Sequence, residues 1–466
     1  MAVDGGHDPP DERAPVNAAT DPPDERAPVN AATDPPDERT AVNDPGLHDP
    51  PAGLAAVDGP RRARLPRWSR PGPRPLEPEP GGRLRLSVDA TAVPARPVGA
   101  GQYTLNLVRA LDAREDVVLT VLCRHGDDGR WAMLAPSATL LAAAPQPRPV
   151  RLAWEQAALP LVLRRHPADV HHGPHYTMPE LTQVPRVVTV HDLTFFDHPE
   201  WHERTKVAVF RRAIRIAARR AAAIVCVSEH TAERLRDRVP PSCPVHVIHH
   251  GVDHERFRPD PPGGVAHDEA VLGRYGIRRP FVAFVGTIEP RKAVDQLVRA
   301  FDRMAGAHAD LRLVLAGTPG WGAQSVDAAI AGARHADRIV RTGYVPDDAV
   351  PALFRRAAAV AYPSAEEGFG MPALEALACG APLVTTRGSV MEDLVGDTAL
   401  LVPFGDIRAL SGALDMLARG DAGLADRRAR GHAVATRHTW EACADAHVAV
   451  YRSVQRMSGD PDPSDR

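Results

Sequence analysis

The sequence predicts an α/β protein with two Rossmann-like domains that face each other across a cleft, preceded by a disordered N-terminal tail. After residue 82, short apolar runs alternate with helical patterns, which is typical of parallel sheets covered by helices. A Pro- and Gly-rich stretch at residues 259–280 lacks apolar periodicity and divides these runs into two sets. Before residue 83 the composition differs, since 18 of the 47 prolines fall there.

The tail is built around a 13-residue unit that starts at Asp8, recurs from Asp21 and begins again at Asp34. The unit has too few large apolar residues to bury a face, and solenoid repeats need about 20–50 residues per unit. We therefore expect residues 1–82 to be disordered and locally polyproline-II-like. An acidic stretch in 1–60 is followed by six arginines in 61–74. Those arginines either contact anionic lipid or neutralise the acidic half of the tail.

The two sets of apolar runs define the predicted domains. The first domain is expected at 83–258, with strands at 84–88, 117–122, 186–190, 223–227 and 245–249. The second is expected at 281–436, with strands at 281–285, 311–316, 338–341, 358–362, 382–385 and 399–402, and helices such as 293–307 and 407–418. Residues 259–280 are interpreted as a linker, 437–457 as a C-terminal helix packed on either half, and 458–466 as a second disordered tail. Sheets of this kind bind ligands at the carboxyl ends of their strands, which places the site in the cleft.

Composition excludes several classes. The chain has no apolar run of 18 residues and no N-terminal apolar signal segment, so we expect neither a membrane span nor secretion. Its five cysteines are far apart and form no Cys-x-x-Cys pair, which argues against a zinc site or a disulfide framework and fits a reducing cytosol. The formal charge of −3 argues against a nucleic-acid partner.

The most specific segment runs from Pro363 to Glu375. A predicted strand ends here, a loop follows, and a helix begins near Pro372, which suits a first helical turn. Glycines 368 and 370 let the backbone approach a ligand, and helix N-terminal amides attract anions. Glu367 and Glu375 add carboxylates that accept hydrogen bonds from sugar hydroxyls. The alternative is a glutamate favoured near a helix start by the helix dipole.

A second segment, 281–292, is a buried-type strand that continues through Gly286 and Thr287 and ends in Arg291 and Lys292. A planar fork and a point charge together suit a diphosphate. Of the 56 basic residues, only Lys206 and Lys292 are lysines, so a lysine directly after an arginine suggests that an ammonium is required. The alternative is a solvated charge pair on a loop.

Two further segments invite other readings. The loop with Gly99 and Gly101 resembles a dinucleotide fingerprint, but Thr104 replaces the third small residue and the second strand ends without an acid, so we reject NAD binding. Such a loop can still hold phosphate by its amides. His191 lies at the end of a predicted strand, where either a cleft residue or a structural histidine would sit. The spacing of His171, His172 and His175 does not indicate a metal site.

Together these motifs resemble the retaining GT-B glycosyltransferases of family 4 (glycosyl transferases group 1), over residues 83–457. The resemblance rests on Glu-Gly-Phe-Gly-Met-Pro-Ala-Leu-Glu (367–375), Gly-Thr-Ile-Glu-Pro-Arg-Lys (286–292), Val-Ser-Glu-His-Thr (227–231), His-Gly-Val-Asp (250–253) and Gly-Tyr-Val-Pro-Asp (343–347). The pattern is most similar to mannosyltransferase-like members of polysaccharide assembly. His249, His250 and Met391 depart from residues common in the family.

The resemblance implies an enzyme that moves a hexose from a nucleotide-diphosphate sugar to a glycan, lipid-linked or small-molecule hydroxyl, with no further cofactor. Because Asp-x-Asp occurs only at 460–462, in the predicted tail, we expect this cytoplasmic enzyme to be metal-independent. It implies catalytic roles for His191, Arg291, Lys292 and Glu367. It also implies donor binding by Gly99, Gly101, Gly286, Thr287, Tyr344, Val345, Gly368, Phe369, Gly370, Met371 and Glu375. A nucleotide-sugar epimerase, a phosphorylase and a degenerate partner subunit are the alternatives.

A stripe of apolar residues at 207–221, flanked by arginines, raises a separate hypothesis. Such a helix either lies on an anionic membrane at the inner face or packs by its apolar stripe into the protein.

Overall fold

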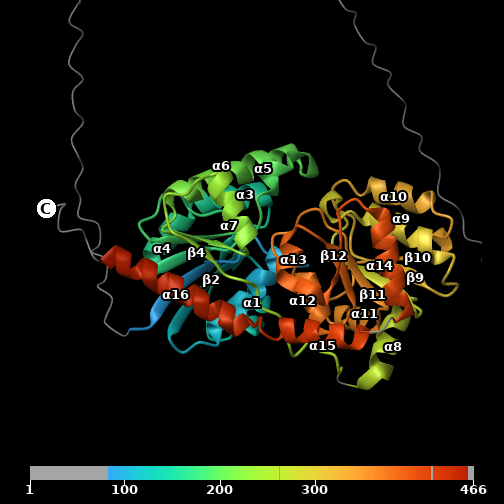
Figure 1. The fold of residues 1–466 in the computed structure, drawn as a ribbon. Coiled ribbons are helices and arrows are strands. Elements are labelled where there is room, and N and C mark those ends of the chain that lie inside the picture. The colour runs from blue at the N-terminus through green and yellow to red at the C-terminus, as the bar shows by residue number, and fades with distance from the viewer. Residues whose placement is uncertain (1–81, 262, 421–422, 460–466) are drawn as a thin grey trace, which may run out of the picture. The chain divides into compact units, whose positions relative to one another are not determined.

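The computed structural model describes residues 82–261, 263–420 and 423–459 (Figure 1). The predicted N-terminal tail with its repeats lies outside these residues except for residue 82, as does the C-terminal tail from residue 460. Within the described residues no helix is long and apolar enough to cross a membrane.

The first half is a seven-stranded parallel sheet in the order β3-β2-β1-β4-β5-β6-β7. Its strands are β1 (Leu84–Asp89), β2 (Val117–Arg124), β3 (Thr139–Ala144), β4 (Val170–Gly173), β5 (Arg186–Val190), β6 (Ala223–Cys226) and β7 (Val245–Val247). Its helices are α1 (Ala100–Asp112), α2 (Asp128–Leu134), α3 (Arg148–Ala157), α4 (Leu159–Arg165), α5 (Thr194–Asp197), α6 (Arg204–Arg220) and α7 (Glu229–Arg238), with a short 3-10 turn at Pro199–Trp201.

The second half is a six-stranded parallel sheet in the order β10-β9-β8-β11-β12-β13. Its strands are β8 (Phe281–Val285), β9 (Arg312–Ala316), β10 (Ile339–Gly343), β11 (Ala359–Tyr362), β12 (Leu383–Thr386) and β13 (Leu400–Val402). Its helices are α8 (Gly264–Arg274), α9 (Val294–Ala305), α10 (Gln324–Ala331), α11 (Val350–Arg356), α12 (Met371–Ala378), α13 (Val390–Val395), α14 (Ile407–Arg419) and α15 (Leu424–Ala435). Three 3-10 turns lie at Pro290–Lys292, Ala336–Arg338 and Gly396–Thr398, and α16 (Trp440–Gly459) is the last of the described elements.

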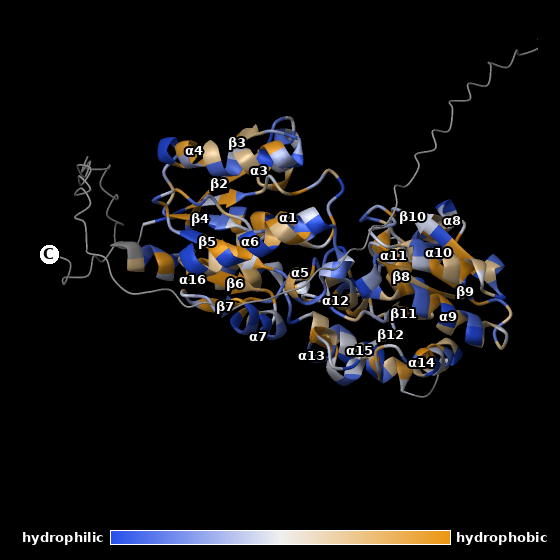
Figure 2. Ribbon diagram, turned by 90° about the horizontal axis from the view of Figure 1, so that it is seen from above, coloured by the Kyte–Doolittle hydropathy of each residue, from blue (hydrophilic) through white to orange (hydrophobic). Residues whose placement is uncertain are grey.

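The sheets are buried because parallel strands have helices on both faces. The strands are largely apolar and the outward helix surfaces largely hydrophilic (Figure 2). On α9, for example, Leu297, Val298 and Phe301 are completely buried at helical spacing against the second sheet. This is the two-sheet α/β architecture that the alternating runs predict, and it matches the predicted fold class.

All eleven predicted strands are present, with bounds that differ by no more than two residues, but two strands were not predicted. β3 reads Thr-Leu-Leu-Ala-Ala-Ala, and alanine favours a helix in isolation. β4 reads Val-His-His-Gly and lacks an apolar run, although all four residues are buried beside β1 and β5. Both segments therefore form strands because they pair with neighbouring strands, although their local composition does not favour a strand.

The stretch predicted as a linker contains helix α8, which is a correction to that prediction. Val271 and Leu272 of α8 are buried in the core of the second half. The buried Asp268 carboxylate accepts hydrogen bonds from Arg355 at 2.7 and 2.9 Å and from Arg356 at 2.7 Å. A short helix with one buried face shows too few apolar positions to give a periodic signal.

The apolar stripe at residues 207–221 lies on helix α6, and the burial of its side chains shows where it packs. Phe210, Ile214 and Ala217 are buried in the core of the first half, while Arg212, Arg215 and Arg219 are exposed. The stripe packs into the protein, which leaves it no apolar face for lipid.

Helix α16 packs on the first half through a buried chain of hydrogen bonds. His447 Nδ1 donates to the Cys443 carbonyl at 2.8 Å, so its Nε2 accepts from the Tyr103 hydroxyl at 2.9 Å. The chain continues through Thr189, at 2.9 Å from Tyr103, to His172 at 2.8 Å. It ends at the Tyr451 hydroxyl, 2.8 Å from His172 Nδ1.

The donors and acceptors of these buried hydrogen bonds can be arranged in only one order. The reason is that each linking side chain, while neutral, donates once and accepts once. Protonation of either histidine would turn an acceptor nitrogen into a second donor facing a donor. Burial lowers the pKa of His447 to about 4 and holds the pKa of His172 well below its usual range. Both rings are therefore neutral in the folded protein at pH 7.

We expect the free energy of unfolding to fall as pH drops from about 6.5 toward 4. Unfolded histidines take up protons near pH 6.5, whereas folded His447 does so only near pH 4, so the unfolded state binds more protons in that window. Each such histidine contributes roughly 1 kcal/mol per pH unit. Urea unfolding of the wild type and His447→Gln between pH 7.5 and 4.5 measures the slope. Equal slopes in both proteins would contradict the assignment.

Candidate active site

The loop from β11 to α12 carries a buried carboxylate that is held by two cations. Arg291 Nη1 donates to Glu367 Oε2, and Lys292 Nζ lies 3.6 Å from Glu367 Oε1. The Ser364 hydroxyl donates to Oε1 at 3.1 Å. Burial by itself would raise the pKa of Glu367, but the two cations outweigh it and hold that pKa at about 2. Three of the four predicted catalytic residues thus form one cluster.

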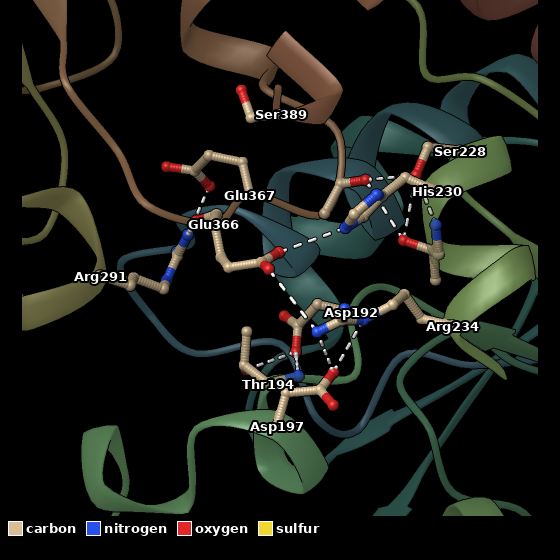
Figure 3. A network of polar contacts seen from close by, with 12 residues as sticks. Asp192, Thr194, Asp197, Ser228, His230, Arg234, Arg291, Glu366, Glu367 and Ser389 are labelled. Carbon is tan, nitrogen blue, oxygen red and sulfur yellow. Dashed lines mark hydrogen bonds and ion pairs between the residues drawn. The ribbon is translucent and has the colours of Figure 1, made fainter. Parts of the chain in front are cut away.

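Arg291 has further contacts besides the one with Glu367 that Figure 3 shows. Its Nη2 donates to Glu289 at 2.9 Å, and Nη1 also donates to the Glu366 carbonyl at 3.1 Å. Burial opposes its charge, but the Glu367 and Glu289 carboxylates outweigh burial and raise the pKa of Arg291. The cation predicted to meet a diphosphate is therefore neutralised by protein carboxylates in this structure.

Gly286 makes room for the Lys292 side chain. A Cβ at Gly286 would lie 3.0 Å from Lys292 Nζ, and its φ of +148° disfavours other residues. Lys292 is only 6% exposed, and its ammonium lies 6.0 Å from the Phe284 ring centroid. Thr287 follows directly and is half-buried. The strand end β8 thus positions the ammonium at the carboxyl edge of the second sheet.

The two halves touch at Gly368 and His191. A Cβ on Gly368 would lie 2.0 Å from the His191 carbonyl oxygen, which no side chain tolerates. The Gly368 carbonyl accepts from the Ser228 hydroxyl at 2.8 Å and from the Thr231 hydroxyl at 3.4 Å. The fourth predicted catalytic residue therefore lies next to the loop that carries Glu367.

His191 follows β5 and is 8% exposed. Its Nε2 lies 2.7 Å from the Pro174 carbonyl, which can only accept, so Nε2 carries the proton and Nδ1 has a free lone pair. Burial lowers the pKa of His191, and the ring is neutral at pH 7. Tyr103 packs edge-on against it with centroids 5.1 Å apart.

A second polar group links the halves beside the first, and its members were not singled out in the sequence (Figure 3). Glu366 Oε2 lies 3.3 Å from His230 Nε2, and Glu366 Oε1 lies 3.7 Å from Arg234. Arg234 also pairs with Asp197 at 2.7 Å. The hydrogen bond to Glu366 raises the pKa of His230. The group lines a small pocket with Asp192, Leu193, Thr194, Thr231 and Glu367.

Glu375 is separate from the Glu367 cluster. It lies within α12 and is half-buried, and its carboxyl group makes no hydrogen bond or ion pair with the described residues. Burial raises its pKa to about 8, and Asp347 and Asp253 add to the shift while Arg256 opposes it. A carboxyl group with that pKa is largely protonated at pH 7, so it can donate as well as accept hydrogen bonds.

The start of α12 is shaped by close packing. Gly370 precedes the helix with φ +99°, and a Cβ there would lie 2.3 Å from Met391 Sδ. The positive φ favours glycine at 370, and the side chain of Met391, one of the residues that depart from the family pattern, fills the space beside it. Phe369 is buried against His250, with centroids 4.7 Å apart, and Met371 is half-buried at the first helical position.

The predicted glycine loop of the first half meets the loop of the second half that carries Tyr344 and Val345. Gln102, which follows Gly101, donates to Asp347, and the Arg96 guanidinium lies 5.2 Å from the Tyr344 ring centroid. Gly99 caps α1 with φ +50°. A Cβ on Gly101 would lie 3.0 Å from Pro97 Cβ, so this residue also serves packing. Val345 is buried in the second core.

Two signals for the missed residues were present in the sequence. Asp192 and Glu366 directly adjoin His191 and Glu367, and His230 lies in the quoted 227–231 motif. The contact between Glu366 and His230 joins segments 136 residues apart, which one sequence does not reveal. His171 and His172 do not share a site, since their ring nitrogens bond to Ser87 and to Thr189 and Tyr451. In the part of the chain that the structure describes, no three metal-binding side chains gather.

Each half of the chain matches a known protein family, and relatives of known name match as well. Residues 97–256 match the family model "Glycosyltransferase Family 4" and residues 274–431 match "Glycosyl transferases group 1", so the two matches cover more than half of the chain. The chain is 27% identical over 378 residues to O-antigen chain mannosyltransferase B of Escherichia coli, covering 76% of this chain and 96% of that protein. It is 36% identical over 222 residues, 46% of this chain and 48% of the relative, to D-inositol 3-phosphate glycosyltransferase of Mycolicibacterium paratuberculosis.

Solved structures agree in fold. Sucrose-phosphate synthase of Thermosynechococcus elongatus superposes with a TM-score of 0.65 at 19% identity, over 80% of this chain and all of that one. Anabaena HepE, solved in complex with UDP-glucose, superposes with a TM-score of 0.64 at 17% identity, over the same shares.

Replacing Gly368 should separate the two halves at this contact. In Gly368→Ala the new methyl group meets the His191 carbonyl, so the loop must retreat and the bonds from Ser228 and Thr231 lengthen. We expect at least a tenfold loss of turnover and a lower melting temperature. Gly412→Ala is the control, because Gly412 is exposed in α14 with open space around its Cβ position and should be neutral or stabilising. Wild-type turnover in Gly368→Ala would refute the contact.

Proposed function

Because the chain belongs to the group 1, family 4 glycosyltransferases and has their GT-B fold, we propose that it transfers a hexose with retention from a nucleotide-diphosphate sugar to a hydroxyl acceptor. The observation that carries this proposal is the cluster of Arg291, Lys292 and Glu367 beside His191. It supplies cations for a leaving diphosphate and a carboxylate for sugar hydroxyls at one place.

Departure of the diphosphate is the step that this cluster would favour. Charge develops on the leaving phosphate as the bond to the sugar carbon breaks, and preorganised cations in a buried site stabilise such charge most strongly. Arg291 and Lys292 are held by packing and hydrogen bonds before any donor arrives, so little reorganisation is needed. The backbone amides at the start of α12 follow the same loop and add partial positive charge to the site.

The state of Glu367 argues against a covalent intermediate. A carboxylate with a pKa of about 2 that pairs with two cations is a weak nucleophile and a weak base. We therefore propose attack of the acceptor on the same face as the departing diphosphate, with no covalent intermediate on Glu367. In this scheme Glu367 holds the donor sugar, His191 contacts it near the reacting carbon, and Glu375 binds the ribose.

Relatives indicate the range of substrates. One relative is an O-antigen mannosyltransferase, and a structural neighbour binds UDP-glucose. We propose a hexose such as mannose as the transferred sugar and a glycan, lipid-linked or small-molecule hydroxyl as acceptor, in a cytoplasmic reaction that needs no metal or further cofactor.

Removing either cation tests the phosphate assignment. Lys292→Ala and Arg291→Ala should each lower turnover at least a hundredfold, because one preorganised donor to developing charge contributes about 10²–10³ in rate. Lys206→Ala is the matched control, since Lys206 is the chain's other lysine and pairs with Glu203 in α6. The measurement is release of nucleoside diphosphate with a screened donor. Near-wild-type turnover in both variants would end the assignment.

A screen of GDP- and UDP-sugars, with the product anomer determined by NMR, tests the donor and the stereochemistry. Retention and unchanged activity in EDTA are expected. Inversion, or activity that is lost on chelation and restored by Mn²⁺, would contradict the scheme. An epimerised donor in the absence of acceptor would instead indicate an epimerase.

A further inference from the structure

Helix α7 of the first half holds the residues on both sides of Glu367. The Glu366 side chain lies 3.3 Å from His230 and 3.7 Å from Arg234, both on α7. The Gly368 carbonyl accepts from two hydroxyl groups at the start of the same helix. Within the part of the chain that the structure describes, the Glu367 carboxylate bonds only to side chains of the second half. Its two neighbours therefore connect it to the first half.

The side chains of Glu366 and Glu367 point to opposite halves. Figure 3 shows Glu366 turned toward His230 and Glu367 turned toward Arg291. The backbone before Glu367 is fixed as well, because the Glu366 carbonyl accepts from Arg291 Nη1 at 3.1 Å and the Ala365 amide donates to the Arg291 carbonyl at 2.7 Å. Since the two glutamates share a peptide bond, a displacement of Glu366 also moves Glu367.

The cation that Glu366 meets on α7 is itself held in place. Arg234 contacts Asp197 Oδ2 through Nε at 3.0 Å and through Nη2 at 2.7 Å. The Asp197 side chain is only 6% exposed and also accepts from Arg238 Nε at 2.7 Å. Two cations thus share one carboxylate, which leaves positive charge on α7 for Glu366. A guanidinium that is already fixed in this way loses little further freedom when it pairs with a second carboxylate.

The hold by α7 matters most when a donor is bound. Arg291 and Lys292 pair with Glu367 in this structure, yet they are also the cations proposed for the donor diphosphate. When a diphosphate takes those cations, the Glu367 carboxylate gives up its two ion pairs and keeps only the hydrogen bond from Ser364. The position of Glu367 then depends on the backbone on either side of it, which α7 holds.

We propose that Glu366, His230 and Arg234 are positioning residues, which hold Glu367 in place for the transfer reaction through bonds between the two halves. Among the described residues, none of these three side chains bonds to Arg291 or Lys292. Nucleotide affinity and turnover should therefore separate when the three residues are changed. The proposal rests on the proposed function for its reaction, but the hold on the loop is measurable without turnover.

Glu366→Gln tests the proposal, because it keeps the size of the side chain and removes its charge. We expect kcat with the donor that the screen identifies to fall at least tenfold, since a misplacement of about 1 Å can cost roughly a hundredfold in rate. The affinity and stoichiometry of UDP or GDP binding, measured by calorimetry, should stay within twofold of the wild type. Wild-type kcat, or a loss of kcat matched by an equal loss of nucleotide affinity or stoichiometry, would overturn the proposal.

A double-mutant cycle tests whether Glu366 and His230 act together. His230→Ala should lower kcat at least fivefold, and adding it to Glu366→Gln should cost little more, because the contact is already lost. Losses that multiply would contradict a shared role. Arg234→Ala should lower kcat at least tenfold. Its matched control is Arg236→Ala, which should keep wild-type kcat, because Arg236 is exposed on the same helix and its side chain makes no hydrogen bond or ion pair with the described residues.

Hydrogen exchange followed by mass spectrometry measures the hold on the loop without turnover. The amides of residues 363–371 should exchange at least fivefold faster in Glu366→Gln than in the wild type, with and without UDP or GDP, while those of α16 stay unchanged. Unchanged exchange in this loop would overturn the proposal even where turnover falls. If the wild type uses no donor but exchange in the loop changes as expected, the proposed function fails and the hold by α7 stands.

Discussion

The buried contact of Glu367 with Arg291 and Lys292 is the interaction on which the rest of the site depends. A carboxylate or an ammonium in such a place is strongly destabilising alone, and removal of one partner leaves an uncompensated buried charge. The cluster therefore forces the ends of β8 and β11 together, and the glycine at 286 follows because the ammonium needs its space. Ser364 donates a further hydrogen bond to Oε1 of this carboxylate.

The first half meets this cluster with neutral groups. His191 stands beside Tyr103, which belongs to the hydrogen-bond chain that fastens α16. Since Tyr103 bonds to Thr189, two residues before His191, the same chain fixes the end of β5 and the helix that returns from the second half. A helix at the very end of the sequence thus holds the strand that carries a predicted catalytic residue.

Local patterns were sufficient for most of the fold. Runs such as Phe-Val-Ala-Phe-Val predict a buried strand, and the sequence singled out Arg291, Lys292 and Glu367, which the structure brings together. What one sequence could not show is that Glu367 already occupies those cations, or that Gly368 abuts His191, because both depend on how distant segments meet. β4 and α8 were missed since their stability comes from neighbours and a buried ion pair, not from periodicity.

The charges around Glu367 and Glu375, the two glutamates of the family motif, explain why their pKa values differ so much. Arg291 and Lys292 are opposed by Glu289, Glu367 and the nearby Asp192, so a diphosphate added to this set would make it strongly anionic. A diphosphate can replace Glu367 as the partner of the cations only if that carboxylate turns toward another donor, and sugar hydroxyls are such donors. Glu375, in contrast, has no cation to release and is largely protonated at pH 7, so it can meet ribose hydroxyls without any exchange of ions. The two carboxyl groups are chemically distinct before a ligand binds, which suits them to different parts of one donor.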